Sequence, residues 1–159
     1  MKNSYIIAIP SYKRHLTIKK QTVAVLEKYK ISPSLVYVFV ANKTEEKIYR
    51  KSLDNAYQKK LTIVVGKKGL KNQRNFISSY FPVMTCIVQM DDDIKGIYKL
   101  VDYNKTNRRE NKTKPMRNLD KFIRDAFSFC HTTETFLWGV YPVFNAYFMF
   151  ERVTDDLRF

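Results

Sequence analysis

The sequence predicts an α/β fold with a mostly parallel sheet and helices on both of its faces. Four short apolar segments rich in β-branched residues occur within the first 90 residues, and a mixed apolar and charged segment separates each from the next. This alternation is typical of parallel strands joined by crossover helices. The 159 residues, 45% of them hydrophobic, are enough for one folded domain with a single core.

The first half of the predicted sheet is read from residues 4–41. The first strand is expected at 4–9, ended by Pro10 and a loop, and 17–30 follow as a helix. The second strand, 35–41, is apolar at every position, which is typical of a central parallel strand that is buried on both faces.

The second half of the sheet is expected from residues 44–90. Thr44 should cap a helix with Glu45 and Glu46 in its first turn. Its inner face is predicted to hold Ile48, Leu53, Ala56 and Tyr57. The third strand is 61–65, a helix at 72–80 points Phe76, Ile77 and Tyr80 inward, and the fourth strand is 85–90.

Beyond residue 93 the regular alternation stops. Residues 102–118 carry six basic and two acidic side chains and almost no apolar ones, which predicts a mobile basic surface loop. Asn118 should cap an amphipathic helix whose inner face holds Leu119, Phe122, Ile123, Ala126, Phe127 and Cys130. The aromatic segment 135–151, broken by Gly139 and Pro142, predicts bent strands around a pocket.

Composition narrows the class of protein. The net charge of +14 favours polyanionic partners, although a coding bias toward lysine explains it equally well. No apolar run reaches the length of a membrane span and no secretory signal is present, so we expect a cytoplasmic protein. Cys86 and Cys130 lack metal-site spacing and are expected to be buried thiols.

Three consecutive aspartates, Asp91 to Asp93, follow the fourth strand. Ligands of parallel sheets bind at the carboxyl ends of the strands, so these side chains are placed at the ligand-binding edge. In an extended segment Asp91 and Asp93 point the same way and Asp92 the other way. Such crowded carboxylates predict a site for Mn²⁺ or Mg²⁺ shared with phosphate oxygens, and the alternative is a solvated acidic turn.

The order of four motifs resembles a known family. Pro10-Ser11-Tyr12-Lys13-Arg14 after the first strand, Val38-Phe39-Val40-Ala41-Asn42, Gly69-Leu70-Lys71-Asn72-Gln73-Arg74-Asn75 and Asp91-Asp92-Asp93 look like the nucleotide-binding half of GT-A-fold glycosyltransferases, which is Rossmann-like. The segment 137–145 is similar to the acceptor-side region of viral and phage members, including the TET-associated group. The resemblance spans about residues 4–150.

The resemblance implies a metal-dependent transferase that moves a sugar from a nucleoside-diphosphate sugar, by default a UDP-sugar, to an acceptor hydroxyl. It places donor binding at Pro10, Ser11, Tyr12, Arg14, Asn42, Gly69, Asn72, Arg74, Asp91 and Asp92, and the metal on Asp91 and Asp93. Arg74 would pair with phosphate or with Asp91. Relatives often have an acidic residue where Asn42 stands, which puts base recognition there in question.

The acceptor side rests on fewer residues. Trp138 and Tyr141 are candidates for stacking on a sugar or acceptor, with core packing as the alternative reading, and Tyr12 is open in the same way. Asp155 and Asp156 are candidates for the catalytic base of an inverting reaction. The acceptor would be a glycan, a protein or modified DNA, in the host cytoplasm if the protein is viral.

The chain is expected to form one domain, 1–159. Residues 1–95 would be its nucleotide-binding half, 102–118 the basic loop and 119–159 the acceptor-side half. Complete GT-A enzymes are usually longer, so this second half is expected to be truncated at the C-terminus. Two other functions stay open, a non-catalytic basic nucleic-acid-binding module and a sugar-phosphate nucleotidyltransferase of related fold.

Overall fold

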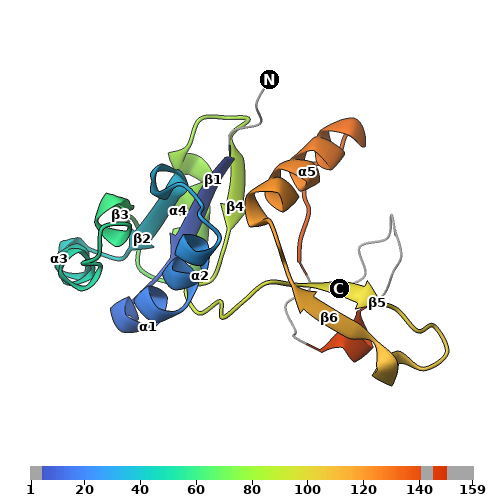
Figure 1. The fold of residues 1–159 in the computed structure, drawn as a ribbon. Coiled ribbons are helices and arrows are strands. Elements are labelled where there is room, and N and C mark those ends of the chain that lie inside the picture. Colours follow the sequence, from blue (N-terminus) through green and yellow to red (C-terminus); the bar gives the residue numbers. More distant parts are fainter. Residues whose placement is uncertain (1–4, 141–144, 150–159) are drawn as a thin grey trace.

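The computed structural model describes residues 5–140 and 145–149, and its centre is a four-stranded parallel sheet (Figure 1). The strands are β1 (Tyr5–Pro10), β2 (Val36–Val40), β3 (Thr62–Val65) and β4 (Cys86–Gln89), in the spatial order β3-β2-β1-β4. Both neighbours of β1 pair with it in parallel. The four predicted strands and their parallel arrangement are therefore confirmed.

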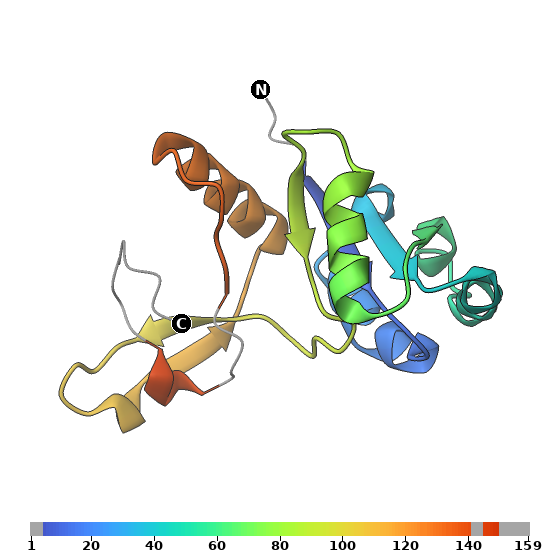
Figure 2. The same cartoon turned by 180° about the vertical axis from the view of Figure 1, so that it is seen from behind.

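Helices cover both faces of this sheet (Figures 1 and 2). The α-helices of this half are α1 (His15–Lys20), α2 (Thr22–Lys28), α3 (Lys43–Ser52) and α4 (Leu70–Tyr80). Figure 2 shows α4 in front of the sheet, and Figure 1 shows α1 and α2 in front of the opposite face. Short 3₁₀ helices occur at Pro33–Leu35, Gln58–Lys60, Arg108–Glu110 and Ala146–Phe148. The predicted α/β class is confirmed.

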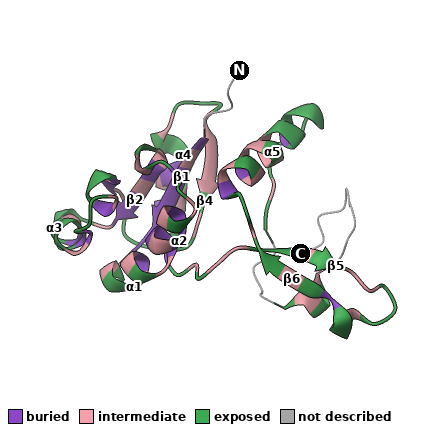
Figure 3. Ribbon diagram, in the orientation of Figure 1, coloured by how far each residue is buried: buried purple, intermediate pink, exposed green. Residues whose placement is uncertain are grey.

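The core lies in this sheet, where buried residues are concentrated (Figure 3). Because successive side chains of a strand point to opposite faces, β1 contributes to two separate clusters. Ile7 and Ile9 belong to the larger cluster, and Ala8 packs in the smaller one with Phe39 and Ile77. Both faces are therefore sealed by apolar contacts, as the continuous apolar sequence of the strands predicted.

The helix expected at residues 17–30 is two helices, and the prediction of one continuous helix is wrong. The break falls at Gln21, whose φ of −117° and ψ of −96° are not helical. The next residue, Thr22, is fully buried, and its hydroxyl donates to the Asp91 carbonyl (2.7 Å) and accepts from the Ile94 amide (2.9 Å). The break places this hydroxyl against the segment that follows β4.

Helix α3 begins two residues earlier than expected. Asn42, not Thr44, is the N-cap, and its side-chain oxygen accepts from the Glu45 amide at 2.9 Å. The helix ends at Ser52, so Ala56 and Tyr57 lie beyond it. Its buried face holds Glu45 and Tyr49, while Ile48 is 39% exposed. Leu53 at the C-cap is buried and Tyr57 packs half-buried against the larger core cluster, so the predicted inward positions are correct for these two residues and wrong for Ile48 and Ala56.

Helix α4 begins at Leu70, two residues before the predicted start, directly after Gly69 with a φ of 92°. Ile77 is buried and Phe76 half-buried, as expected. Tyr80 is 44% exposed, so its predicted inward position is wrong, and its ring packs edge-on against Phe39 and Phe81 at the rim of the core.

Residues 98–117 form an antiparallel hairpin, so the segment 102–118, predicted to be a loop throughout, contains paired strand residues. Strands β5 (Tyr98–Asp102) and β6 (Lys112–Pro115) pair with each other, and a register shift falls between Leu100 and Asp102. Backbone pairing requires no apolar side chains, which is why a chain segment so rich in charge still forms strands.

Helix α5 (Leu119–Thr132) follows the hairpin and lies beside β4 (Figures 1 and 2). Asn118 caps it as predicted, accepting from the Lys121 amide at 2.9 Å. Leu119 and Ile123 join the larger core cluster, and Tyr5 of β1 donates a hydrogen bond to Asp120 (2.8 Å). The amphipathic helix is therefore confirmed and is fastened to the sheet.

The aromatic segment after α5 differs from its prediction. Its described residues, 135–140 and 145–149, contain a 3₁₀ helix and no strand. Cys130 is buried as expected, whereas Cys86 is only half-buried, and burial raises the pKa of its thiol. No helix in the described part of the chain is both long and apolar enough to cross a membrane.

Candidate functional site

The candidate site lies where β1 and β4 end side by side. The two strands pair in parallel, with Ala8 opposite Gln89, and the Met90 amide donates to the Ala8 carbonyl at 3.1 Å. The loop after β1 and the aspartates after β4 therefore leave the sheet at the same edge. Arg74, on α4, reaches the same place from the third crossover, because it contacts both Gln89 and Asp91.

Asp92 is the buried member of the triplet, with 5% of its surface exposed. Ser11 donates to one carboxylate oxygen at 2.5 Å, and Arg14 binds the other at 3.0 Å. Burial raises the pKa of Asp92, and the Ser11 hydrogen bond and the Arg14 charge oppose that shift. Both carboxylate oxygens are thus engaged inside the protein, so Asp92, predicted as a donor contact, holds the two loops together.

The loop after β1 is fixed by side chains of α3 as well. The Ser11 hydroxyl also hydrogen-bonds the Tyr49 hydroxyl (2.7 Å), which accepts from the Arg14 amide at 3.0 Å. The Lys13 amide donates to Glu45 at 2.8 Å, and Lys13 has a positive φ of 56°. Sequence reasoning missed Tyr49 and Glu45, whose only signal is the presence of polar atoms on a buried helix face.

The outer two aspartates point to solvent, each beside an arginine. Their side chains are 60% (Asp91) and 47% (Asp93) exposed. Arg74 binds Asp91 at 2.7 Å, and Arg14 binds Asp93 at 3.0 Å, which raises the pKa of the Arg14 guanidinium. Asp92 is buried and its two neighbours are exposed, although residues 92–93 form a turn and not the extended segment that was expected. Arg74 pairs with Asp91, one of its two expected partners.

The donor atoms of the outer aspartates fit the predicted divalent cation in kind. Asp91 and Asp93 supply hard, exposed carboxylate oxygens, and Mg²⁺ and Mn²⁺ are commonly held by one or two carboxylates together with substrate phosphates. No cluster of three or more metal-ligating side chains occurs among the residues that the structure describes. A cation here would replace the arginines on the two carboxylates and would take its remaining ligands from phosphate and water.

The other predicted donor residues lie around the same edge. Tyr12 is 40% exposed, with the Lys13 ammonium 5.4 Å from its ring centre. Asn42 is the N-cap of α3, so its side-chain oxygen is already engaged by the Glu45 amide. Pro10 is the buried end of β1. Asn72 lies in the first turn of α4, which follows Gly69, and its side chain donates to the Lys68 carbonyl at 3.2 Å.

An open hollow of about 430 Å³ adjoins the start of α4. Its lining residues are Lys67, Lys68, Asn72, Asn75, Phe76 and Ser79. Sequence reasoning identified Asn72 but missed the two lysines, which follow β3 and therefore also lie at the carboxyl edge of the sheet. Their charge adds to that of Arg14 and Arg74 on this side of the molecule.

The acceptor-side predictions have different outcomes. Trp138 is half-buried and its ring packs edge-on against Phe122 (5.8 Å between ring centres) and Phe127 (5.5 Å) of α5, which matches the core-packing alternative. Tyr141, Asp155 and Asp156 lie outside the described residues.

Comparison of the chain with protein-family models, with curated proteins and with solved structures finds no match.

Proposed function

We propose that the protein is a metal-dependent glycosyltransferase that uses a nucleoside-diphosphate sugar, with a UDP-sugar as the default donor. The observation that supports it is the meeting of two exposed carboxylates with two arginines at the carboxyl edge of a parallel sheet. Diphosphate sugars carry negative charge that needs cationic partners, and open α/β sheets bind ligands at this edge. Asp91 and Asp93 would hold the Mn²⁺ or Mg²⁺.

In the proposed reaction each residue of the site would have a distinct role. Cleavage of the sugar–phosphate bond leaves negative charge on the nucleoside diphosphate, and the bound cation would stabilise that charge as it develops. Arg74 would turn from Asp91, and Arg14 from Asp93, to phosphate oxygens, since both arginine side chains are at least one-third exposed. Arg14 would keep its contact with buried Asp92 through its other terminal nitrogen. Tyr12 would pack near the base, and Asp92 would keep the Arg14 loop in place.

The acceptor hydroxyl needs a base if the reaction inverts configuration, and Asp155 and Asp156 are the proposed candidates. Tyr141 is the remaining aromatic candidate for stacking on the acceptor, because Trp138 packs against α5. A glycan, a protein or modified DNA would accept the sugar in the cytoplasm, or in the host cytoplasm if the protein is viral.

The test is the melting temperature with and without UDP, in the presence and absence of Mn²⁺. A ligand that binds only the folded state adds about 2.7 kcal/mol at 100 times its dissociation constant, so UDP with Mn²⁺ should raise the melting temperature by several degrees. The variant Asp93→Asn should lose the Mn²⁺-dependent part of this shift.

Asp125→Asn is the matched control, because Asp125 is also an exposed carboxylate that pairs with a cation, Lys121, on α5. It should keep the full response. The proposal is wrong if no nucleoside diphosphate raises the melting temperature with Mn²⁺, or if both variants lose the response equally.

A further inference from the structure

The hairpin and its flanks form a strongly basic segment of the chain. Residues 98–117, called the basic hairpin below, contain seven Lys and Arg and two Asp and Glu, for a net charge of +5. In Figure 1 this hairpin stands apart from the four-stranded sheet, and the segment after β4 and helix α5 connect it to that sheet. Its charge is therefore concentrated away from the candidate site.

Two lysines face each other across the hairpin. Lys99 lies directly opposite Lys114 in the antiparallel pairing, and both are exposed. Like charges in opposite positions of a strand pair destabilise the hairpin. Neither lysine forms an ion pair with any other described residue. The nearby Lys112 forms a long ion pair with Asp102, with 3.6 Å between the ammonium nitrogen and the carboxylate oxygen. A polyanion bound to this face would remove the repulsion.

The two faces of the hairpin are unlike. Alternation puts Lys99 and Lys114 on one face and Leu100 and Thr113 on the other. Leu100 and Thr113 are half-buried, whereas the lysines are exposed. The face that carries the two lysines is therefore more exposed than the face that carries Leu100 and Thr113.

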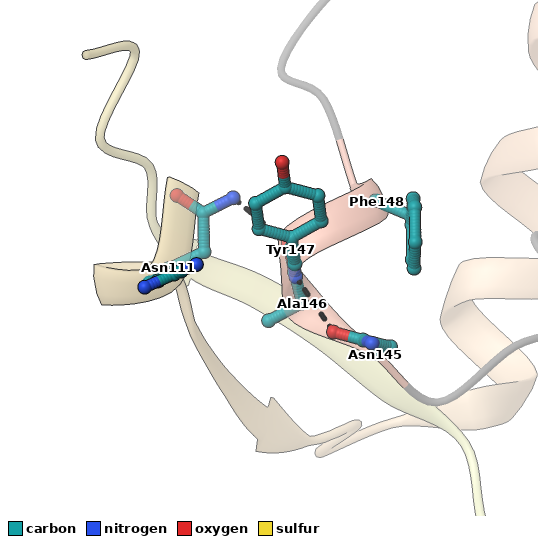
Figure 4. Close-up of a pocket in the computed structure, with 6 residues that line it drawn as sticks. Asn111, Asn145, Ala146, Tyr147 and Phe148 are labelled. Atoms are coloured by element: carbon teal, nitrogen blue, oxygen red, sulfur yellow. Dashed lines mark hydrogen bonds between the residues drawn. The ribbon is translucent and has the colours of Figure 1, made fainter. Parts of the chain in front are cut away.

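An open hollow of about 500 Å³ lies beside the turn of the hairpin (Figure 4). Its lining residues are Arg109, Asn111, Asn145, Ala146, Tyr147 and Phe148. Asn111 is buried and fixes the wall, because its side-chain amide donates to the carbonyls of Ala146 (2.8 Å) and Met149 (3.3 Å). These two hydrogen bonds fix the wall of the hollow in the fold.

The hollow offers aromatic surface next to positive charge. Tyr147 is 43% and Phe148 47% exposed, and their rings meet edge-on at 5.0 Å. The guanidinium of Arg108 lies 5.8 Å from the Tyr147 ring centre, and Arg109 lines the hollow. Exposed rings beside cations are the combination that binds unpaired bases between phosphates.

We propose that the basic hairpin binds single-stranded nucleic acid. Its lysines and arginines contact successive phosphates, and one base stacks in the hollow against Tyr147 or Phe148. An acidic peptide would satisfy the charges but would leave the aromatic hollow unused, and a duplex keeps its bases stacked away from such a ring. This inference does not depend on the proposed transferase activity.

The experiment measures fluorescence anisotropy of a labelled 12-nucleotide oligo-dT at salt concentrations between 50 and 200 mM. Replacing both opposed lysines, Lys99→Gln with Lys114→Gln, should weaken binding about tenfold at the lowest salt. Each lost phosphate contact lowers the slope of log affinity against log salt by about 0.7, so the double variant should lose about 1.4. The substitutions relieve repulsion in the hairpin, so the variant is expected to fold.

The matched control is Lys47→Gln with Lys51→Gln, which removes the same charge from exposed positions of α3. It should leave the slope unchanged. Tyr147→Ala should weaken oligo-dT binding about fivefold or more without changing the slope, because stacking is not ionic.

Three results would overturn the inference: equal loss in the α3 control, equal affinity for poly-glutamate, or equal affinity for a 12-base-pair duplex. Asp93→Asn should bind oligo-dT like the unaltered protein. Loss of the UDP response alone would then disprove only the transferase proposal, and loss of the oligo-dT response alone would disprove only this one.

Discussion

The sheet of β1 to β4 and the hairpin of β5 and β6 build strands by different means. In β1 and β2 nine of the eleven residues are buried, whereas neither β5 nor β6 contains a buried residue. The sheet is stabilised by apolar contacts on both faces, and the hairpin by backbone pairing and by polar contacts such as those of Asn111. Strand geometry alone therefore does not show how much a strand contributes to stability.

The largest difference between the two regions is expected in the loss of stability when one aliphatic side chain of each is shortened to alanine. Ile7→Ala, in a fully buried β1 position between β2 and β4, should lower the free energy of unfolding by about 2–5 kcal/mol. Leu100→Ala, in half-buried β5, should cost less than about 1.5 kcal/mol, because solvent already reaches the side chain. Urea denaturation of both variants measures the difference.

Equal losses of stability would show that the hairpin is as tightly packed as the sheet. The stability that a strand contributes would then not follow the burial of its side chains.

A second prediction concerns the link between the regions. Tyr5→Phe removes the hydroxyl that β1 donates to Asp120 of α5, and loss of such a bond costs about 1 kcal/mol. Hydrogen exchange should become faster in α5 than in β1, because α5 loses one of its contacts with the sheet while the sheet itself stays intact.

Tyr57→Phe is the control for this prediction. The Tyr57 hydroxyl is buried without a hydrogen-bond partner among the described residues, and burial raises its pKa to about 12. Its removal should leave stability unchanged or slightly raised. Equal destabilisation by the two variants would mean that the bond to Asp120 has no specific role.

The smallest expected effect is electrostatic and lies on the surface of the sheet region. Arg50 and Lys43 bind Glu46 on α3 and lower the pKa of its carboxyl, so this contribution to stability is present above the unfolded pKa and is lost as the pH falls through the folded pKa. In Arg50→Ala the pKa of Glu46 should rise toward its ordinary value in an NMR titration.

Lys47→Ala, on the same helix and with the same loss of charge, should shift the pKa of Glu46 less than Arg50→Ala does. Equal shifts would point to general screening and not to the ion pair with Arg50.

The sequence predicted the sheet well because a strand buried on both faces must be apolar throughout, and this pattern is visible locally. The hairpin was missed, because strands that bury no side chain resemble a charged loop. In the candidate site the aspartates were found because they directly follow a predicted strand, and Arg74 was found because residues 69–75 resemble a motif of GT-A-fold enzymes. Glu45, Tyr49 and Thr22 were missed, because their partners lie more than 30 residues away.

The Thr22 hydroxyl, between the Asp91 carbonyl and the Ile94 amide, joins the start of α2 to the backbone that carries the triplet. Any displacement of α2 would therefore be transmitted to the carboxylates through two hydrogen bonds and no side chain of the triplet itself. The position of the three aspartates therefore depends on the break between α1 and α2, which lies far from them in the chain.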